Sequence, residues 1–221
     1  MKNYIVIIGD IKKSKQISDR NCIQKKFESC LNEINANYKN DIAANFLITL
    51  GDEFQGVLSA GKNLFKIIDH IKSSIYPQKL RFGIGIGQIS TDLNNIALGS
   101  DGPAYYAARR SIEYLHQLEK TEKLKTQDIY VGIYNSYNSI VDEINMFLKL
   151  SYLIEYSWND KQRNTYKMLN RYPKQIDCAK ALCVTQSAVA KRLASGNYKT
   201  YQETRKLVLP LIDKLLEIRN D

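Results

Sequence analysis

The segment from Leu80 to Ile89 constrains the fold most strongly, because glycine alternates there with large apolar residues. Successive side chains of a β-strand point to opposite faces. Gly83, Gly85 and Gly87 would therefore share one face and leave it without side chains. A helix or a ligand can approach such a face closely. We expect close packing of a helix, which favours a sheet covered by helices.

Other periodic patterns predict a series of strands and helices before residue 150. We expect strands over residues 4–9, 46–50, 53–58, 80–89 and 129–134, and helices over residues 19–38, 62–75, 103–117 and 139–150. The order strand, helix, hairpin, helix, strand, helix, strand, helix indicates an α+β sandwich, with helices over a mostly antiparallel sheet.

Basic charge and a lack of strand patterns set the last third of the chain apart. Residues 151–221 contain 13 Lys and Arg against seven Asp and Glu, whereas residues 1–150 contain 19 against 16. Such an excess is typical of a unit that faces a polyanion, although many mildly basic proteins bind no nucleic acid. We expect an α+β domain over residues 1–150 and a small all-α domain over residues 157–221.

The composition favours a cytoplasmic protein without a membrane partner. No apolar run reaches the roughly 20 residues that span a bilayer, and the first residues lead directly into a predicted strand. The four cysteines include no CxxC pair, so we expect reduced and mostly buried thiols.

Two Gly-Asp pairs follow apolar strands and provide candidate metal ligands. Asp10 ends the first predicted strand, and Asp52 lies in the turn of the predicted hairpin. Carboxylates in these places can converge, and with the backbone carbonyl of Ile11 they would suit Mg²⁺, which in turn holds substrate phosphates. Glu53 is a secondary candidate ligand. The alternative is ordinary turn chemistry, because Gly-Asp is a common turn pair.

Four sequence stretches occur in the order seen in class III nucleotidyl cyclases. They are Ile8–Ile11, Leu50–Phe54, Arg81–Gly87 and Ala104–Arg109. Gly51–Phe54 also resembles the signature of the GGDEF diguanylate cyclases, which share the palm-type fold. This likeness covers about residues 1–135, and the whole chain is similar to the SatD family. The resemblance implies a ferredoxin-like, palm-type sandwich for the first domain.

The cyclase resemblance implies roles for several matching residues. Asp10 and Asp52 match the two metal-binding aspartates, which implies Mg²⁺ or Mn²⁺ as cofactor. Arg109 matches the arginine that stabilises phosphate charge in the transition state, a role that suits a permanently charged planar donor. Because the active site of this fold commonly forms between two subunits, the resemblance also implies a homodimer.

Three residues depart from the cyclase pattern. Tyr105 stands at the second catalytic position, which is usually Asn, and a phenol cannot repeat the contacts of an amide. Ile48 and Leu98 stand where the residues that select the purine base would be. The metal half of the expected site is therefore present, whereas the base-reading half is not.

A glycine-rich turn before residue 103 forms a candidate nucleotide-binding site. Gly99, Asp101 and Gly102 precede Pro103, where the predicted helix begins. Free N–H groups and the dipole at a helix N-terminus favour an anion. Lys12, in a basic loop after the first strand, could steer phosphates. The alternative is an ordinary helix start with Asp101 near the cap, and a solvated lysine.

Residues 175–193 resemble a helix-turn-helix DNA-binding domain. Ala179 is small where two helices would cross, Cys183 lies in the turn, and Val189 lies on the buried side of the second helix. The turn position is usually Gly, and a left-handed cysteine there would be strained. The alternative is a helical bundle used for dimerisation. Candidate DNA contacts are Thr185, which also suits the N-cap, Gln186, Ser187, Lys191 and Arg192.

These features favour a DNA-binding regulatory protein whose first domain binds a nucleotide or phosphate ligand with Mg²⁺. The alternative is an enzyme, a metal-dependent nucleotidyl cyclase or nucleotidyltransferase that uses a nucleoside triphosphate, with the helical domain for DNA targeting or control. A purely structural dimer module is disfavoured, because Asp10, Asp52 and Arg109 are all retained.

Overall fold

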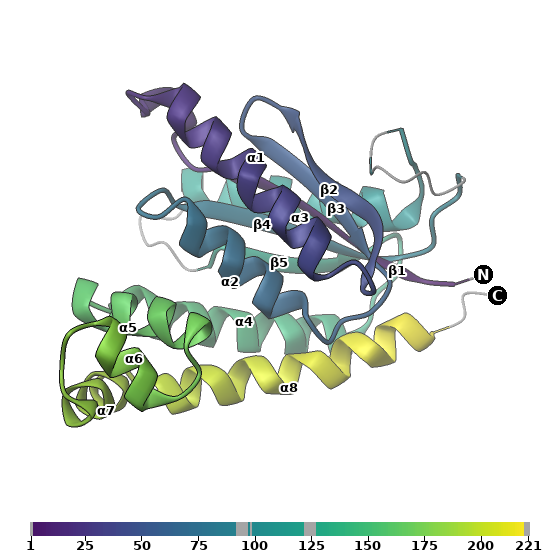
Figure 1. Ribbon diagram of the computed structural model, residues 1–221. Helices are drawn as coiled ribbons and strands as arrows, with labels where there is room; N and C mark the ends of the chain where they lie inside the picture. Colours follow the sequence, from purple (N-terminus) through teal and green to yellow (C-terminus); the bar gives the residue numbers. More distant parts are fainter. Residues whose placement is uncertain (1, 92–96, 98, 122–126, 219–221) are drawn as a thin grey trace.

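A computed structural model of the chain describes residues 2–91, 97, 99–121 and 127–218, and these residues form a mixed α/β structure (Figure 1). Their five strands and eight α-helices confirm the α+β class. The strands are β1 (Tyr4–Ile11), β2 (Ile42–Leu50), β3 (Glu53–Leu58), β4 (Leu80–Gly87) and β5 (Ile129–Ile133). The helices are η1, a short 3-10 helix (Ser14–Gln16), α1 (Arg20–Asn37), α2 (Leu64–Ser74), α3 (Pro103–Thr121), α4 (Ser139–Ser157), α5 (Asp160–Arg171), α6 (Gln175–Ala181), α7 (Gln186–Ser195) and α8 (Tyr198–Glu217).

The strands form one sheet in the order β2-β3-β1-β4-β5. Neighbouring strands are antiparallel except β4 and β5, which are parallel. The central strand β1 therefore has β3 on one side and β4 on the other. At its end, Asp10 lies directly opposite Glu53 of β3 and Arg81 of β4. This register brings three charged residues together on one face of the sheet.

The two faces of the sheet bury different sets of helices. Ile5 and Ile7 of β1 belong to a core shared with α1, α2, α4 and α8. Val6 and Ile8, which alternate with them, belong to a smaller core shared with α3. The apolar run of β1 is thus buried on both faces, as expected of a central strand.

The glycines of β4 allow α3 to lie very close to the sheet, as the alternation in the sequence predicted. A Cβ atom added to Gly85 would lie 2.0 Å from the carbonyl oxygen of Ala104 and 2.3 Å from the amide nitrogen of Ala108. A Cβ atom on Gly83 would lie 2.5 Å from the carbonyl oxygen of Ala108. Only backbone occupies these places, so a side chain at either glycine would require α3 to move.

Helices α5, α6 and α7 form a small helical cluster, and α8 connects this cluster to the sheet. Helices α5, α6 and α7 enclose a core of Leu169, Cys178, Ala179 and Val189. Helix α8 begins in this cluster and runs back along α4 (Figure 1). Its buried residues Val208, Ile212 and Leu215 then join the larger core of the sheet.

Some helix bounds differ from those expected. Helix α8 begins at Tyr198 and continues through Pro210. Helix α4 continues to Ser157, beyond the expected end at residue 150. None of the described helices combines the length and the apolar character needed to cross a bilayer.

Candidate functional sites

Asp10 lies at the centre of a mostly buried charge cluster at the end of the sheet. Its Oδ1 atom lies 2.5 Å from Nη1 of Arg81, and its Oδ2 atom lies 2.6 Å from Nε2 of His116 on α3. Nη2 of Arg81 also lies 3.0 Å from Oε2 of Glu119, which pairs with Lys12 as well. We call Asp10, Lys12, Arg81, His116 and Glu119 the Asp10 cluster.

The pKa shifts of the two carboxyl groups in the cluster have opposite signs. Burial raises the pKa of Asp10, and the neighbouring charges of Arg81 and His116 oppose this only in part. The charge of Asp52, which precedes the Glu53 that lies opposite Asp10, raises the pKa of Asp10 further. Burial also acts to raise the pKa of Glu119, but the hydrogen bonds and charges of Lys12 and Arg81 outweigh it and lower that pKa.

The predicted metal ligands gather at this end of the sheet, but Asp10 is already bound on both oxygens. Glu53 shares the face of Asp10, and its Oε2 atom lies 2.7 Å from Nη1 of Arg109. Ile11 is a buried residue of the larger core. A cation at Asp10 would lie beside the guanidinium of Arg81 and compete with Nε2 of His116 for the carboxylate. This arrangement disfavours a metal ion at Asp10.

Within the described ranges, no group of three or more His, Cys, Asp or Glu side chains is placed to hold a metal ion. The Mg²⁺ or Mn²⁺ site stays a prediction, for which the partly exposed Asp52 is the best-placed ligand.

The two residues predicted to be catalytic have different surroundings. Arg109 is half-exposed and reaches from α3 to Glu53 of β3. Tyr105 is buried, and its hydroxyl donates a hydrogen bond to the carbonyl oxygen of Ala97 at 3.2 Å. Burial raises the pKa of Tyr105. Arg109 could therefore meet a ligand directly, whereas the Tyr105 hydroxyl holds the loop before α3.

The residues predicted to bind a nucleotide lie at opposite ends of α3. Gly99, Asp101 and Gly102 precede its N-terminus, whereas Lys12 pairs with Glu119 near its C-terminus. At a rise of 1.5 Å per residue, these ends are about 25 Å apart. The structure does not bring the four residues into one site.

Protein groups also occupy the start of α3. The Ala104 N–H donates to the carbonyl oxygen of Gln88 at 3.1 Å. The carboxylate of Asp101 accepts a hydrogen bond from the Tyr106 hydroxyl at 2.6 Å.

Of the two positions linked to base selection, Ile48 is partly buried in β2 and Leu98 lies outside the described residues.

A tight turn joins α6 to α7. Cys183 has a φ angle of 53°, which is the left-handed conformation that the turn pattern implied and that is strained for a cysteine. Thr185 caps α7 and accepts a hydrogen bond from the Ala188 N–H at 3.2 Å. Ala179 and Val189 are buried, as the pattern predicted. The backbone of this segment thus follows the local expectations closely.

The residues predicted to contact DNA are not all equally exposed. Gln186, Ser187 and Lys191 are exposed on α7, and Thr185 is exposed beside its cap. Arg192 is partly buried and donates to Oγ1 of Thr165 on α5 at 3.4 Å. Four of the five side chains therefore share an open surface, whereas Arg192 packs against the helical cluster.

Sequence reasoning missed the partners of Asp10. Arg81 begins the cyclase-like stretch Arg81–Gly87 and His116 lies outside all four stretches, but the sequence assigns neither a role. Both reach Asp10 only through the β1–β4 register and the position of α3. It also missed a cleft between α2 and the helical cluster, because the residues that line it come from distant parts of the chain.

Comparison with known proteins identifies a family. The model of the SatD family matches residues 4–212, which include the sheet, the helical cluster and most of α8. A search of curated proteins found no match. The family match covers nearly the whole chain, so the sheet and the helical cluster are parts of one family unit. The chain belongs to the SatD family.

Proposed function

We propose that this protein is a DNA-binding regulator, in which α6 and α7 form a helix-turn-helix and α7 enters the major groove. The observation that carries the proposal is the geometry of α7. The helix is capped by Thr185, anchored by the buried Val189, and presents Gln186, Ser187 and Lys191 to solvent. Glutamine and serine can contact base edges, and lysine can contact phosphates.

The charge distribution supports this proposal. The basic excess of residues 151–221 gives the helical part the sign that a phosphate backbone requires. In addition, α7 is joined to α6 by a turn of only a few residues, which is typical of helix-turn-helix units. A homodimer would match a two-fold DNA site, and cytoplasmic location would give access to DNA.

A nucleotide or phosphate ligand for the sheet domain is the second half of the proposal. The cyclase-like motifs and the palm-type resemblance support it, together with the half-exposed Arg109 next to Glu53. Two groups already hold the carboxylate of Asp10, so ligand binding has more support here than metal-dependent catalysis. Mg²⁺ would enter this account as a companion of the ligand at Asp52.

The alternative enzyme, a nucleotidyl cyclase or nucleotidyltransferase, draws support from one observation. The charge of Asp52 raises the pKa of Asp10, and Glu53, the next residue, lies opposite Asp10 in the sheet, so the two aspartates lie at the same end of the sheet. This function predicts release of pyrophosphate from a nucleoside triphosphate with Mg²⁺ or Mn²⁺, and its loss in Asp52→Ala. Absence of release from all four common triphosphates would exclude it.

An electrophoretic mobility shift with fragments of the source genome tests the DNA proposal. The wild-type chain should retard at least one fragment, and Gln186→Ala/Lys191→Ala should not. Retardation by both proteins alike would contradict the assignment of α7.

Thermal unfolding with nucleoside triphosphates, with and without Mg²⁺, tests the ligand. A ligand that binds the folded state must raise the Tm. Asp52→Ala suits this test because Asp52 lies in a turn, whereas loss of Asp10 would leave the buried Arg81 with fewer partners. A Mg²⁺-dependent part of the shift that survives in Asp52→Ala and in Arg109→Ala would place the ligand elsewhere.

A further inference from the structure

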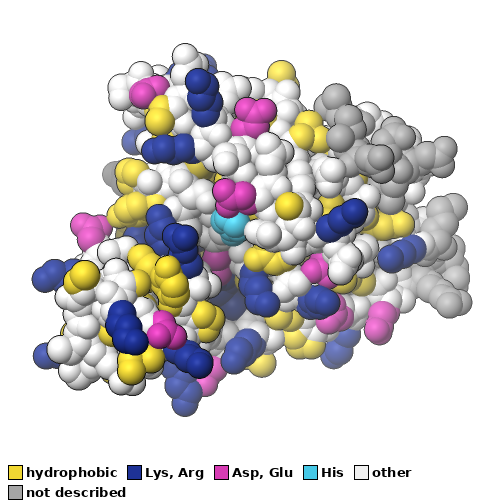
Figure 2. All heavy atoms as spheres, in the orientation of Figure 1, with side chains coloured by type: hydrophobic (Ala, Val, Ile, Leu, Met, Phe, Trp, Pro, Cys, Tyr) yellow, Lys and Arg dark blue, Asp and Glu magenta, His cyan; other side chains and the backbone are white. Residues whose placement is uncertain are grey.

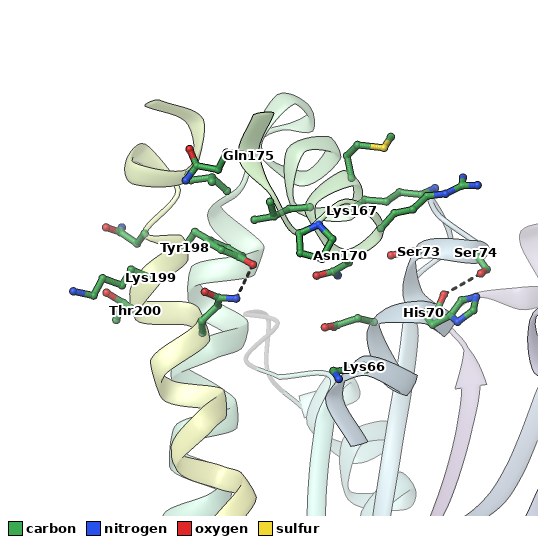
Figure 3. A pocket seen from close by; sticks show the side chains of 18 of the residues that line it. Lys66, His70, Ser73, Ser74, Lys167, Asn170, Gln175, Tyr198, Lys199 and Thr200 are labelled. Atoms are coloured by element: carbon green, nitrogen blue, oxygen red, sulfur yellow. Dashed lines mark hydrogen bonds between the residues drawn. The ribbon is translucent and has the colours of Figure 1, made fainter. Parts of the chain in front are cut away.

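A cleft of about 1210 Å³ lies between α2 and the helical cluster (Figure 3). Helices α1 and α2 form one wall, and α5, the end of α7 and the start of α8 form the other. Figure 2 shows Lys and Arg side chains gathered around the lower left of this face, over the helical cluster and α2. The cleft is slightly larger than the roughly 300–1,000 Å³ of ordinary ligand pockets.

Both walls of the cleft carry cations. Lys66 comes from α2, Lys167 and Arg171 come from α5, and Lys199 comes from the start of α8. Across the described part of the chain, no carboxylate forms an ion pair with Lys66, Lys167 or Arg171. Lys199 has only a loose contact of 3.8 Å with Glu203, and both are exposed.

The acidic side chains of the cleft already have partners. The carboxylate of Asp69 accepts hydrogen bonds from Nη1 of the buried Arg205 at 2.8 and 2.9 Å, and one from the Tyr166 hydroxyl. Oε2 of Glu33 lies 3.2 Å from Nε2 of His70. These carboxylates therefore do not neutralise the lysines, and the positive charge is left for a ligand.

Tyr198 adds a hydrogen-bond donor to the cleft. Its hydroxyl oxygen accepts a hydrogen bond from Nε2 of Gln202 at 2.7 Å. No described protein group accepts the hydroxyl proton, so the proton is free for a ligand oxygen. Burial raises the pKa of Tyr198 to about 12, which keeps that proton in place at neutral pH. The ring also offers an apolar surface beside Leu193 and Met168.

We propose that this cleft binds a small anion with several phosphates, of the size of a nucleoside triphosphate, between Lys66 on one wall and Lys167 and Arg171 on the other. Cations on opposite walls suit a ligand with more than one negative group, which can pair with both walls at once. A concave site favours a small ligand over duplex DNA, which helix-turn-helix proteins contact with a protruding helix.

This site is separate from the Asp10 cluster and adjoins the proposed DNA reader. Leu193 and Ala194 at the end of α7 line the cleft, whereas Gln186 and Ser187 lie at its start. At 1.5 Å per residue, the two ends of α7 are about 12 Å apart. A ligand that bridges the walls would thus restrain α7 without covering its DNA-facing end.

Isothermal titration calorimetry with the full chain tests the proposal. The probes are inorganic tripolyphosphate and adenosine triphosphate, with EDTA present so that no metal ion contributes. Both probes should bind, and Lys66→Glu/Lys167→Glu should weaken binding at least tenfold. The control Lys26→Glu/Lys149→Glu makes the same charge change at exposed lysines of α1 and α4 outside the cleft, and should change the affinity less than threefold.

Each outcome of the titration decides the matter. Absence of binding of both probes to the wild-type chain at millimolar concentration overturns the proposal, as does equal weakening in the control. If the wild-type chain binds neither small probe and Lys66→Glu/Lys167→Glu loses duplex DNA binding, the cleft is a nucleic-acid surface instead. Circular dichroism checks the folding of each variant. If Lys66→Glu/Lys167→Glu does not fold, Lys66→Gln/Lys167→Gln replaces it. Binding that is lost in Lys66→Glu/Lys167→Glu reports on this cleft, whereas the Mg²⁺-dependent part of the Tm shift reports on the sheet domain, so the two proposals fail separately.

Discussion

Arg81 and Asp10 lie directly opposite each other on β4 and β1, and 2.5 Å separates Nη1 from Oδ1. Both side chains are nearly buried, so each depends on the other for compensation of its charge. The pair ties the central strand to its neighbour at the end where the cyclase-like motifs meet. Because of this pair, the Asp10 cluster resembles a structural ion-pair cluster as much as it resembles a metal centre.

Loss of one member of this pair should be costly. Arg81→Met leaves the Asp10 carboxylate buried beside His116 alone, so we expect the free energy of unfolding to fall by about 3–5 kcal/mol. Asp10→Asn/Arg81→Met removes both charges and should cost less than the single change. Urea denaturation of the three proteins measures the difference. A single variant as stable as the wild type would show that the pair contributes little.

Glu119 should make the stability of the protein depend on acid pH. Its pKa in the folded protein lies below the ordinary value of 4.5. The folded state therefore favours the charged form, so the stabilisation is present above about pH 4.5 and is lost as the pH falls through the lowered pKa. We expect the urea midpoints of the wild type and Glu119→Gln to differ most at neutral pH and to converge as the pH falls through the lowered pKa. Glu113→Gln, exposed on the same helix, should follow the wild type at every pH; a constant gap for Glu119→Gln would contradict the assignment.

Gly85 and Gly87 should respond differently to the same substitution. The Cβ atom of Gly85→Ala would overlap backbone atoms of α3, so we expect a loss of at least about 3 kcal/mol or failure to fold. The nearest atom to a Cβ on Gly87 is the amide nitrogen of Ala104 at 3.4 Å, and Gly87→Ala should cost less than about 1 kcal/mol. Thermal unfolding of both variants tests the close approach of α3. Equal and small losses would mean that α3 lies farther from the sheet.

Cys183 offers a stabilising substitution. Its left-handed backbone costs a non-glycine residue about 1–2 kcal/mol, of which glycine avoids most while losing some entropy. Cys183→Gly should therefore raise the free energy of unfolding by about 0.5–1 kcal/mol. Cys183→Ala keeps the Cβ atom and removes only the sulfur, so it should give no gain. A gain in both variants would trace the effect to the thiol rather than to the backbone.

Local features of the fold could be predicted from the sequence. Asp19 and Thr185 each precede an amphipathic stretch, and each caps its helix as such residues do. The Gly51-Asp52 turn separates β2 from β3 where the hairpin pattern placed it. These outcomes depend on residues within one turn of each other, so a single sequence contains the necessary information.

Long-range features could not be predicted in the same way. Lys12 was predicted to steer phosphates from a basic loop, with a solvated lysine as the alternative, but it is buried against Glu119 of α3. The pairing depends on the register of β1 and on how α3 crosses the sheet, neither of which is encoded near Lys12. Likewise, the apolar residues of α8 fit a helical bundle as well as they fit the core of the sheet. The packing of Ile212 shows that the helix returns to the sheet.

The salt dependence of DNA binding tests the central claim most directly. In a fluorescence anisotropy titration of a retarded fragment between about 50 and 200 mM salt, the affinity of the wild type should fall steeply, because bound lysines release counterions from the phosphates. Lys191→Ala should bind more weakly and reduce the slope of log K against log salt by about one, whereas Lys25→Ala on the distant α1 should change neither. Equal affinities and slopes for the wild type and Lys191→Ala would contradict the placement of α7 on DNA.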